Sequence, residues 1–328
     1  MKSFKAMILA AGLATRLRPL TNSRPKVLIP IQNRPLLHWL VEFLWSAGAE
    51  EVIVNGHHLS DKLVDSVRRA NFPIPVHVRV EKVLLGTGGG IRNVADFWDE
   101  RPLVVINGDI LTSVDLREVC LEHESSGAMA TLVLKDEPQF NRVQVADDGR
   151  IFGFTGGAEK LLAFTGIAVL DPEILALIPA DIPTSIIDCY LQLISRGKKV
   201  MAHVAEEQYW RELGSLEGYF QAHQELFRPR KIPFQRLQVS GKAVVHKSAS
   251  LDYNTKLDGM VCIGQECVLE RDVIIQESVI WDQVRVTAGC SIRRSIIGDG
   301  VVVTESLEGV VVGKEGRVEL EAGKEKRE

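Results

Sequence analysis

The chain has 328 residues, 45% of them hydrophobic and 25% charged, which excludes disordered and collagen-like proteins and suggests about two globular domains. Its formal net charge of −4 argues against nucleic acid or a membrane surface as the main partner. No apolar run approaches the ~18 residues that cross a bilayer. No signal-peptide pattern begins the sequence, so we expect a cytoplasmic protein.

The five cysteines are scattered and form no CxxC pair: Cys120, Cys189, Cys262, Cys267 and Cys290. Their number is odd and their spacing fits neither a disulfide framework nor a zinc site. We therefore expect them to be small buried apolar residues in a reducing compartment.

Strand-like and helix-like segments alternate over the first two thirds of the chain. Apolar runs predict strands at residues 4–9, 51–55, 76–80 and 103–106. Helical spacing predicts helices at residues 36–47, 60–70 (with Ser60 as cap) and 91–97. Segments near 131–134, 143–145 and 151–154 look antiparallel, with a turn at 147–149. The pattern predicts an α/β domain with a Rossmann-like, mixed but mostly parallel sheet.

Beyond Phe227 the sequence changes character. Apolar residues recur every six positions: Val245, Leu251, Leu257, Ile263, Leu269, Ile275 and Trp281. A hexapeptide repeat is typical of a parallel β-helix, in which each side of a triangular coil takes one repeat. We expect three to four coils from Val245 to about Gly313. The predicted domains are residues 1–228, a linker at 229–240, and a β-helix with a charged tail at 241–328.

The strongest chemical signal is the segment of residues 9–30. A strand runs into a turn of small residues, whose backbone N–H groups can approach anionic oxygens. The residues assigned to nucleotide binding there are Leu9, Ala10, Ala11, Gly12, Ala14 and Thr15. Arg16 and Lys26 follow, and both suit phosphate binding. The segment contains neither a Walker P-loop nor a GxGxxG fingerprint.

This segment resembles the signature of the sugar-1-phosphate nucleotidyltransferases, also called nucleotide-sugar pyrophosphorylases. Their pattern, roughly GxGTRLxPLTxxxPKxLxP, matches residues 12–30 except at Ala14, where the family has Gly. We expect Ala14 to be accommodated with a negative φ. Several family members also carry a left-handed β-helix after the transferase domain.

Further segments resemble the family and imply roles for their residues. Asp109, after a strand, matches a metal-binding Asp, and Glu212 stands at the second metal position, where Asp is usual. Gly86, Thr87 and Gly88 lie in a loop like the family's base-binding loop. Asn107, Thr165 and Gly166 are assigned to the sugar. The family's Glu-Lys-Pro element is reduced to Glu159-Lys160-Leu161.

The resemblance implies the reaction of a nucleoside triphosphate with a sugar 1-phosphate to give a nucleotide sugar and pyrophosphate, with Mg²⁺ as cofactor. Arg16, Lys26 and Asp109 are the catalytic candidates. GTP with mannose 1-phosphate is the first expectation, and UTP with an amino-sugar or glucose 1-phosphate is the alternative. A catalytically silent regulatory paralogue also stays open, whereas the few coils of the β-helix and its single histidine, His246, argue against an acyltransferase activity. The β-helix is expected to brace the transferase domain or to form a homo-oligomer.

Overall fold

The computed structural model describes residues 3–154, 161–228 and 243–320. The predicted linker, the charged tail, and Glu159 and Lys160 lie outside these residues. The chain forms two compact units. Unit 1 comprises Met1–Leu13 and Leu37–Trp210, and unit 2 comprises Ala14–Leu36 and Arg211–Glu328. The units therefore divide the chain differently from the predicted domains, because part of the amino-terminal signature belongs to the unit that contains the β-helix.

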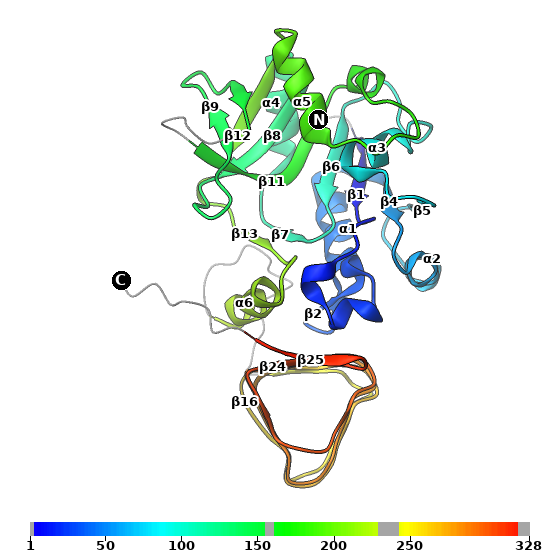
Figure 1. Ribbon diagram of the computed structural model, residues 1–328, viewed down its shortest axis with the longest axis vertical. Coiled ribbons are helices and arrows are strands. Elements are labelled where there is room, and N and C mark those ends of the chain that lie inside the picture. Colours follow the sequence, from blue (N-terminus) through cyan, green and yellow to red (C-terminus); the bar gives the residue numbers. More distant parts are fainter. Residues whose placement is uncertain (1–2, 155–160, 229–242, 321–328) are drawn as a thin grey trace. The chain divides into compact units, whose positions relative to one another are not determined.

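Unit 1 is built on a mixed sheet (Figure 1). Four parallel strands lie in the order β5 (Val76–Val80), β4 (Ala49–Gly56), β1 (Phe4–Leu9) and β6 (Leu103–Asn107). The sheet continues through β11 (Leu161–Leu170), which is antiparallel to β6, then β8 (Ala130–Lys135), antiparallel to β11, and β12 (Val200–Val204), parallel to β8. The expectation of a mixed, mostly parallel α/β sheet is confirmed.

The predicted antiparallel hairpin is also present. It joins β9 (Val143–Val145) to β10 (Ile151–Gly153), and β9 in turn pairs with β11. The Gly149 N–H donates to the Ala146 carbonyl at 2.9 Å, which closes the expected turn.

The remaining elements of unit 1 connect these strands. They are α1 (Leu36–Ala47), α2 (Ser60–Arg69), α3 (Gly86–Arg92), β7 (Ile110–Thr112), α4 (Leu116–Ser126), the 3₁₀ helix η4 (Pro172–Leu177) and α5 (Ile186–Ser195). Helix α1 has its predicted bounds. Ser60 is the first residue of α2 and not its cap, since the N-cap is Leu59. The helix predicted at 91–97 instead begins at Gly86 and ends at Arg92.

Unit 2 contains a parallel β-helix, whose triangular section is visible at the bottom of Figure 1. One side stacks β14 (Ala243–Val245), the ends of β16 (Lys256–Ile263) and β18 (Ile274–Ile280), β21 (Ile296–Ile297) and β24 (Val310–Gly313). The second side stacks β15 (Ser250–Leu251), β17 (Val268–Leu269), β19 (Arg285–Val286) and β22 (Val302–Val303). The third stacks the starts of β16 and β18 with β20 (Ser291–Arg293) and β23 (Leu307–Glu308), and β25 (Gly316–Glu319) pairs antiparallel with β24.

The hexapeptide register is correct up to Ile275 and wrong at Trp281. Leu257 pairs with Ile275, 18 positions later, but Ile263 pairs with Ile280, only 17 positions later. This shortened coil places Ile280 in the core of the β-helix in place of the next residue. Trp281 is buried outside that core, where its ring meets Tyr219 of α6 (Leu216–Phe227).

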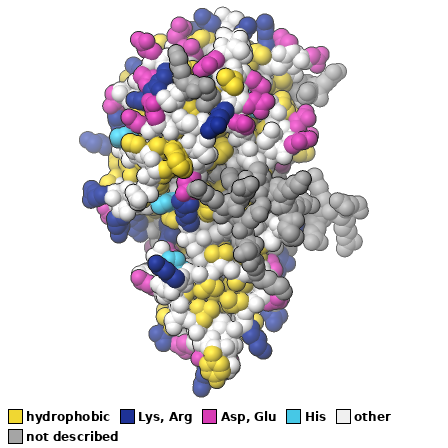
Figure 2. Space-filling model, turned by 180° about the vertical axis from the view of Figure 1, so that it is seen from behind, with side chains coloured by type: hydrophobic (Ala, Val, Ile, Leu, Met, Phe, Trp, Pro, Cys, Tyr) yellow, Lys and Arg dark blue, Asp and Glu magenta, His cyan; other side chains and the backbone are white. Residues whose placement is uncertain are grey.

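All five cysteines are buried and free, as expected. Burial raises the pKa of the Cys120 thiol to about 12 and that of Cys267 to about 11. Such thiols are protonated and unreactive at neutral pH. In the part of the chain that the structure describes, no helix has the length and apolar character to span a bilayer. Acidic and basic side chains are interspersed over the face seen in Figure 2.

Candidate active site

The signature loop, defined here as residues 14–30, belongs to unit 2 and is folded into three short 3₁₀ turns. These are η1 (Thr15–Leu17), η2 (Leu20–Asn22) and η3 (Lys26–Leu28). Leu17, Leu20, Val27 and Leu28 are buried. The chain then forms a small antiparallel pair, β2 (Pro30–Ile31) and β3 (Arg34–Pro35). Buried apolar residues on each turn thus fix the backbone that carries Arg16 and Lys26.

Ala14 departs from expectation, because its φ is 50° and not negative. This left-handed conformation costs a non-glycine residue about 1–2 kcal/mol, which explains why glycine suits the position. Two hydrogen bonds hold it: the Ala14 carbonyl accepts from the Thr21 hydroxyl at 2.8 Å and from the Leu17 N–H at 3.1 Å. The surrounding turn therefore enforces the conformation that the family's glycine adopts without strain.

Arg16, Lys26 and Glu212 converge on Gly214 in unit 2. Arg16 Nη2 lies 2.8 Å from Glu212 Oε1. A Cβ atom built on Gly214 would lie 2.8 Å from Arg16 Nη2 and 2.8 Å from Lys26 Nζ, and would collide with Glu212 Oε1. A side chain at position 214 would therefore displace the ends of these three side chains. Two cations thus surround one carboxylate, and this excess of positive charge suits an anionic ligand such as a phosphate.

Glu212 ends β13 (Trp210–Glu212), just before helix α6. Ser215 caps that helix, and its hydroxyl accepts from the Gly218 N–H at 3.0 Å. Serine is one of the residue types that cap helices most effectively. The cap lies three residues after Glu212 and fixes the start of α6, so the carboxylate approaches Arg16 from a defined backbone.

In unit 1, Asn107 is the last residue of β6 and Asp109 follows two residues later, at the carboxyl end of the strand, where open α/β sheets bind ligands. Leu9 of β1 pairs with Asn107, and the Gly108 N–H donates to the Leu9 carbonyl at 2.8 Å. The turn assigned to nucleotide binding (residues 9–15) therefore begins beside the segment that carries Asp109. A Cβ atom on Gly12, in that turn, would meet no atom of the described chain within 4 Å. A ligand has room to approach the backbone there.

Gly166, which the sequence assigns to the sugar together with Asn107, lies directly against that residue. Its φ is 82°, and a Cβ there would be 2.5 Å from Asn107 Nδ2, so no other residue fits. Thr165 is buried, and its hydroxyl donates to the Val133 carbonyl at 2.7 Å. The Thr165 carbonyl accepts from Trp210 Nε1 at 2.9 Å. Thr165 thus fixes the strand, while Asn107 is partly exposed and Gly166 packs against it.

The glycine loop of residues 86–88 opens helix α3 and is tied to the start of α5. The N–H groups of Gly88 and Gly89 both donate to the Thr184 carbonyl, and the Ile186 N–H donates to the Thr87 hydroxyl. The Gly88 amide is therefore occupied within the protein. Gly86 and Thr87 are exposed and remain the candidates for nucleotide contact.

The buried side chains of Asn55 and Glu81 form an amide–carboxylate pair that joins the glycine loop to the turn assigned to nucleotide binding (residues 9–15). Asn55 Oδ1 accepts from the Ala10 N–H at 2.7 Å, and Asn55 Nδ2 donates to Glu81 Oε1 at 2.6 Å. The other Glu81 oxygen accepts from the Leu85 N–H at 3.1 Å. Both side chains are almost fully buried. The pair fixes two loops from different segments, because each buried polar atom must keep its partner.

Asn55→Ala is expected to raise the KM for the nucleotide about 10-fold or more, since an orphaned buried partner costs ~1–3 kcal/mol. The Ala10 N–H and the Glu81 carboxylate both lose a partner in this variant, so the melting temperature is expected to fall as well. Steady-state kinetics and thermal unfolding measure the two effects. Asn71→Ala, at an exposed asparagine of the same unit, is the control. An unchanged KM in a folded Asn55 variant would contradict this role.

The described residues contain no group of three or more His, Cys, Asp or Glu side chains placed to hold a metal ion. Asp109 and Glu212, the two predicted metal ligands, each offer carboxylate oxygens, the ligand type that Mg²⁺ takes. Asp109 belongs to unit 1 and Glu212 to unit 2. Oε1 of Glu212 accepts a hydrogen bond from Arg16 Nη2 at 2.8 Å.

Comparison with known proteins agrees with this chemistry. Residues 5–228 match the family model described as Nucleotidyl transferase, and residues 239–322 match the model described as GMPPB C-terminal domain. The chain belongs to the nucleotidyl transferase family. It is accordingly a nucleotidyltransferase, which confirms the resemblance found in the signature loop.

Curated relatives align along most of the chain. The mannose-1-phosphate guanylyltransferase of Mycobacterium tuberculosis is 30% identical over 302 residues, which cover 88% of this chain and 83% of the relative. The UTP–glucose-1-phosphate uridylyltransferase of Synechocystis is 26% identical over 337 residues, covering 89% and 87%. The chain thus resembles enzymes with different nucleotides in their names.

Solved structures share the fold. The UDP-glucose pyrophosphorylase of Acinetobacter baumanii superposes with a TM-score of 0.63 at 21% identity and covers 72% of this chain and 96% of its own. HddC of Yersinia pseudotuberculosis, solved in complex with GMP-PN, superposes with a TM-score of 0.58 at 24% identity, covering 67% and 97%. These likenesses confirm the fold of the transferase part.

Proposed function

We propose that the protein is a sugar-1-phosphate nucleotidyltransferase that joins GTP and mannose 1-phosphate to give GDP-mannose and pyrophosphate. The observation that carries the proposal is the approach of two cations, Arg16 and Lys26, to Gly214 with only one carboxylate, Glu212, beside them, which leaves an excess of positive charge for an anionic substrate. Both substrates are anions, so the main tasks of the protein are charge neutralisation and alignment. The choice of GTP and mannose is supported by the guanylyltransferase relative and by the match to the GMPPB C-terminal model.

In this reaction an oxygen of the sugar phosphate attacks the α-phosphorus, and the bond from that phosphorus to the bridging oxygen of pyrophosphate breaks. The attacking oxygen is already ionised near neutral pH, so no general base is needed. Arg16 is proposed to hold the β- and γ-phosphates and to offset the charge of the leaving pyrophosphate. Lys26 is proposed to contact the reacting phosphates as a point charge.

Asp109 and Glu212 are proposed to hold Mg²⁺, which would supply Lewis-acid polarisation of the α-phosphate. Asn107 and Gly166 are proposed to contact the sugar. Their position supports this, because Asn107 ends β6 at the carboxyl edge of the sheet and Gly166 lies directly against its amide. Gly12, Gly86 and Thr87 are proposed to line the nucleotide.

The alternative nucleotide is UTP, which is supported by the uridylyltransferase relative. The deciding experiment is a matrix of four nucleoside triphosphates against mannose, glucose and N-acetylglucosamine 1-phosphates, scored by magnesium-dependent pyrophosphate release. The highest kcat/KM is expected for GTP with mannose 1-phosphate. Release with no combination would favour the silent paralogue, and a higher value with UTP would favour the uridylyltransferase.

A further inference from the structure

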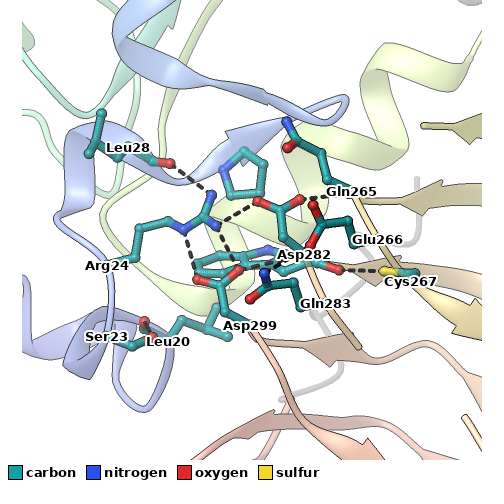
Figure 3. Close-up of polar contacts among 12 residues, drawn as sticks. Leu20, Ser23, Arg24, Leu28, Gln265, Glu266, Cys267, Asp282, Gln283 and Asp299 are labelled. Carbon is teal, nitrogen blue, oxygen red and sulfur yellow. Dashed lines mark hydrogen bonds and ion pairs between the residues drawn. The ribbon is translucent and has the colours of Figure 1, made fainter. Parts of the chain in front are cut away.

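The signature loop lies on the β-helix within unit 2, and Arg24 is its main polar anchor (Figure 3). Arg24 Nε donates to Asp299 Oδ2 at 2.8 Å. Arg24 Nη2 donates to Asp299 Oδ1 and to Asp282 Oδ2, both at 2.7 Å. The guanidinium also lies over the ring of Trp281, 5.1 Å from its centroid. Arg24 thus makes a two-pronged pair with one aspartate and a further bond to the other, a geometry that lysine cannot reproduce.

The two aspartates are rigid parts of the β-helix. They lie 17 residues apart on neighbouring coils, and each also accepts a backbone N–H: Asp282 from Gln265 at 2.8 Å, and Asp299 from Asp282 at 3.3 Å. The three charged side chains are only 18–25% exposed. Burial opposes the charge of Arg24, but the two carboxylates outweigh it and raise the pKa of the guanidinium.

Two further contacts fix the remainder of the loop and the residues after it to the same body. The Tyr219 hydroxyl donates to the Pro30 carbonyl at 2.6 Å and accepts from Trp281 Nε1 at 3.0 Å. Asn33 Nδ2 donates to the carbonyls of Val244 and Ile263, at the ends of two stacked strands. The loop is therefore held to successive coils and not to one flexible side chain.

Close backbone approach reinforces this attachment at η2. A Cβ atom on Gly313 would lie 2.9 Å from Pro19 Cβ and 3.1 Å from the Pro19 carbonyl oxygen. A Cβ on Gly298 would lie 3.2 Å from a methyl of Leu20. Larger residues in these coils would push the loop away, so its distance from the β-helix is set at this contact as well.

Arg24 stands two residues before Lys26, and its Nη1 lies 3.5 Å from the Leu28 carbonyl, on the other side of that lysine. We propose that Arg24, held by Asp282 and Asp299, is a positioning residue through which the β-helix fixes Lys26 for phosphate binding. The inference rests on the proposed function for its kinetic consequence. Its structural part, the anchoring of the loop, is measurable without any substrate.

The test compares the wild type with the triple variant Arg24→Met/Asp282→Asn/Asp299→Asn. Removing all three charges together leaves no buried charge unpaired, so the fold is expected to be retained. Hydrogen–deuterium exchange of residues 15–29 is expected to be at least 10-fold faster than in the wild type, and kcat at least 10-fold lower. Arg24→Lys keeps the charge without the two-pronged geometry. Arg24→Lys is also expected to speed exchange and to lower kcat. If the triple variant does not fold, this single variant tests the proposal in its place.

The control is Arg285→Met/Glu270→Gln, which removes an exposed ion pair of the same β-helix and is expected to change neither quantity. A positioning role also predicts non-additivity: in a Lys26→Ala background, the triple variant is expected to lower kcat less than 2-fold further. Unchanged exchange at residues 15–29, or unchanged kcat with faster exchange, would overturn the proposal. A wild type inactive with every substrate pair refutes the proposed function and the kinetic role together, while the exchange data separately decide the anchoring.

Discussion

Lys26→Ala is expected to lower kcat about 100- to 1,000-fold, because a preorganised charge at the reacting centre supplies ~2.7–4 kcal/mol of transition-state stabilisation. Lys26 begins η3, whose next two residues, Val27 and Leu28, are buried. These buried neighbours fix the backbone that carries Lys26, and Gly214 places no side chain against its ammonium group. Pyrophosphate release under saturating substrates measures the effect.

The fold is expected to survive this substitution, since Lys26 is only half-buried and its apolar neighbours remain. Lys26→Arg keeps a cation and is expected to recover part of the activity, because a planar guanidinium does not replace a compact point charge. Lys198→Ala, at an exposed lysine of unit 1, should behave as wild type. A purified Lys26→Ala enzyme with turnover within 3-fold of wild type would remove this residue from the mechanism.

The parts of the candidate site that lie within one short segment of the chain could be predicted from the sequence. Arg16 and Lys26 stand in one short segment with buried apolar residues between them, so their chemistry follows from the residue types and spacing. The β-helix was likewise visible in its hexapeptide repeat up to Ile275. Its register failed at Trp281 because the loss of one residue from a coil shifts every later side chain. No local composition marks such a loss.

The parts of the structure that depend on contacts between residues far apart in the chain could not be predicted from the sequence. Arg24 and Asp282 are 258 positions apart, and nothing near either residue indicates the other. Asn55 and Glu81 stand on neighbouring strands and loops, and their pairing depends on the order of the sheet. The helix at Gly86 was missed for a related reason. Glycines disfavour helices locally, whereas the Thr184 carbonyl and the tight packing on α5 stabilise this one.

Asp109→Asn is expected to lower kcat at least ~100-fold, on the same scale of one lost charge, and to raise the Mg²⁺ concentration needed for half-maximal activity. The change preserves shape and removes only the carboxylate. Asp109 follows β6, whose register with β1 is fixed by the Leu9–Asn107 pair and by the Gly108 N–H bond to Leu9. The backbone that presents the side chain is therefore expected to stay unchanged, and the loss can be assigned to the charge.

Activity measured over a series of Mg²⁺ concentrations separates metal binding from general damage. A carboxylate that holds the ion predicts partial recovery of Asp109→Asn at high Mg²⁺, because mass action compensates for weaker binding. A residue that only stabilises the fold predicts a lower melting temperature and no such recovery. Asp188→Asn, at an exposed position of α5, should retain both the rate and the Mg²⁺ dependence of the wild type. If Asp109→Asn shows wild-type turnover at every Mg²⁺ concentration, Asp109 is not a metal ligand, and the acidic part of the proposed site must be reassigned.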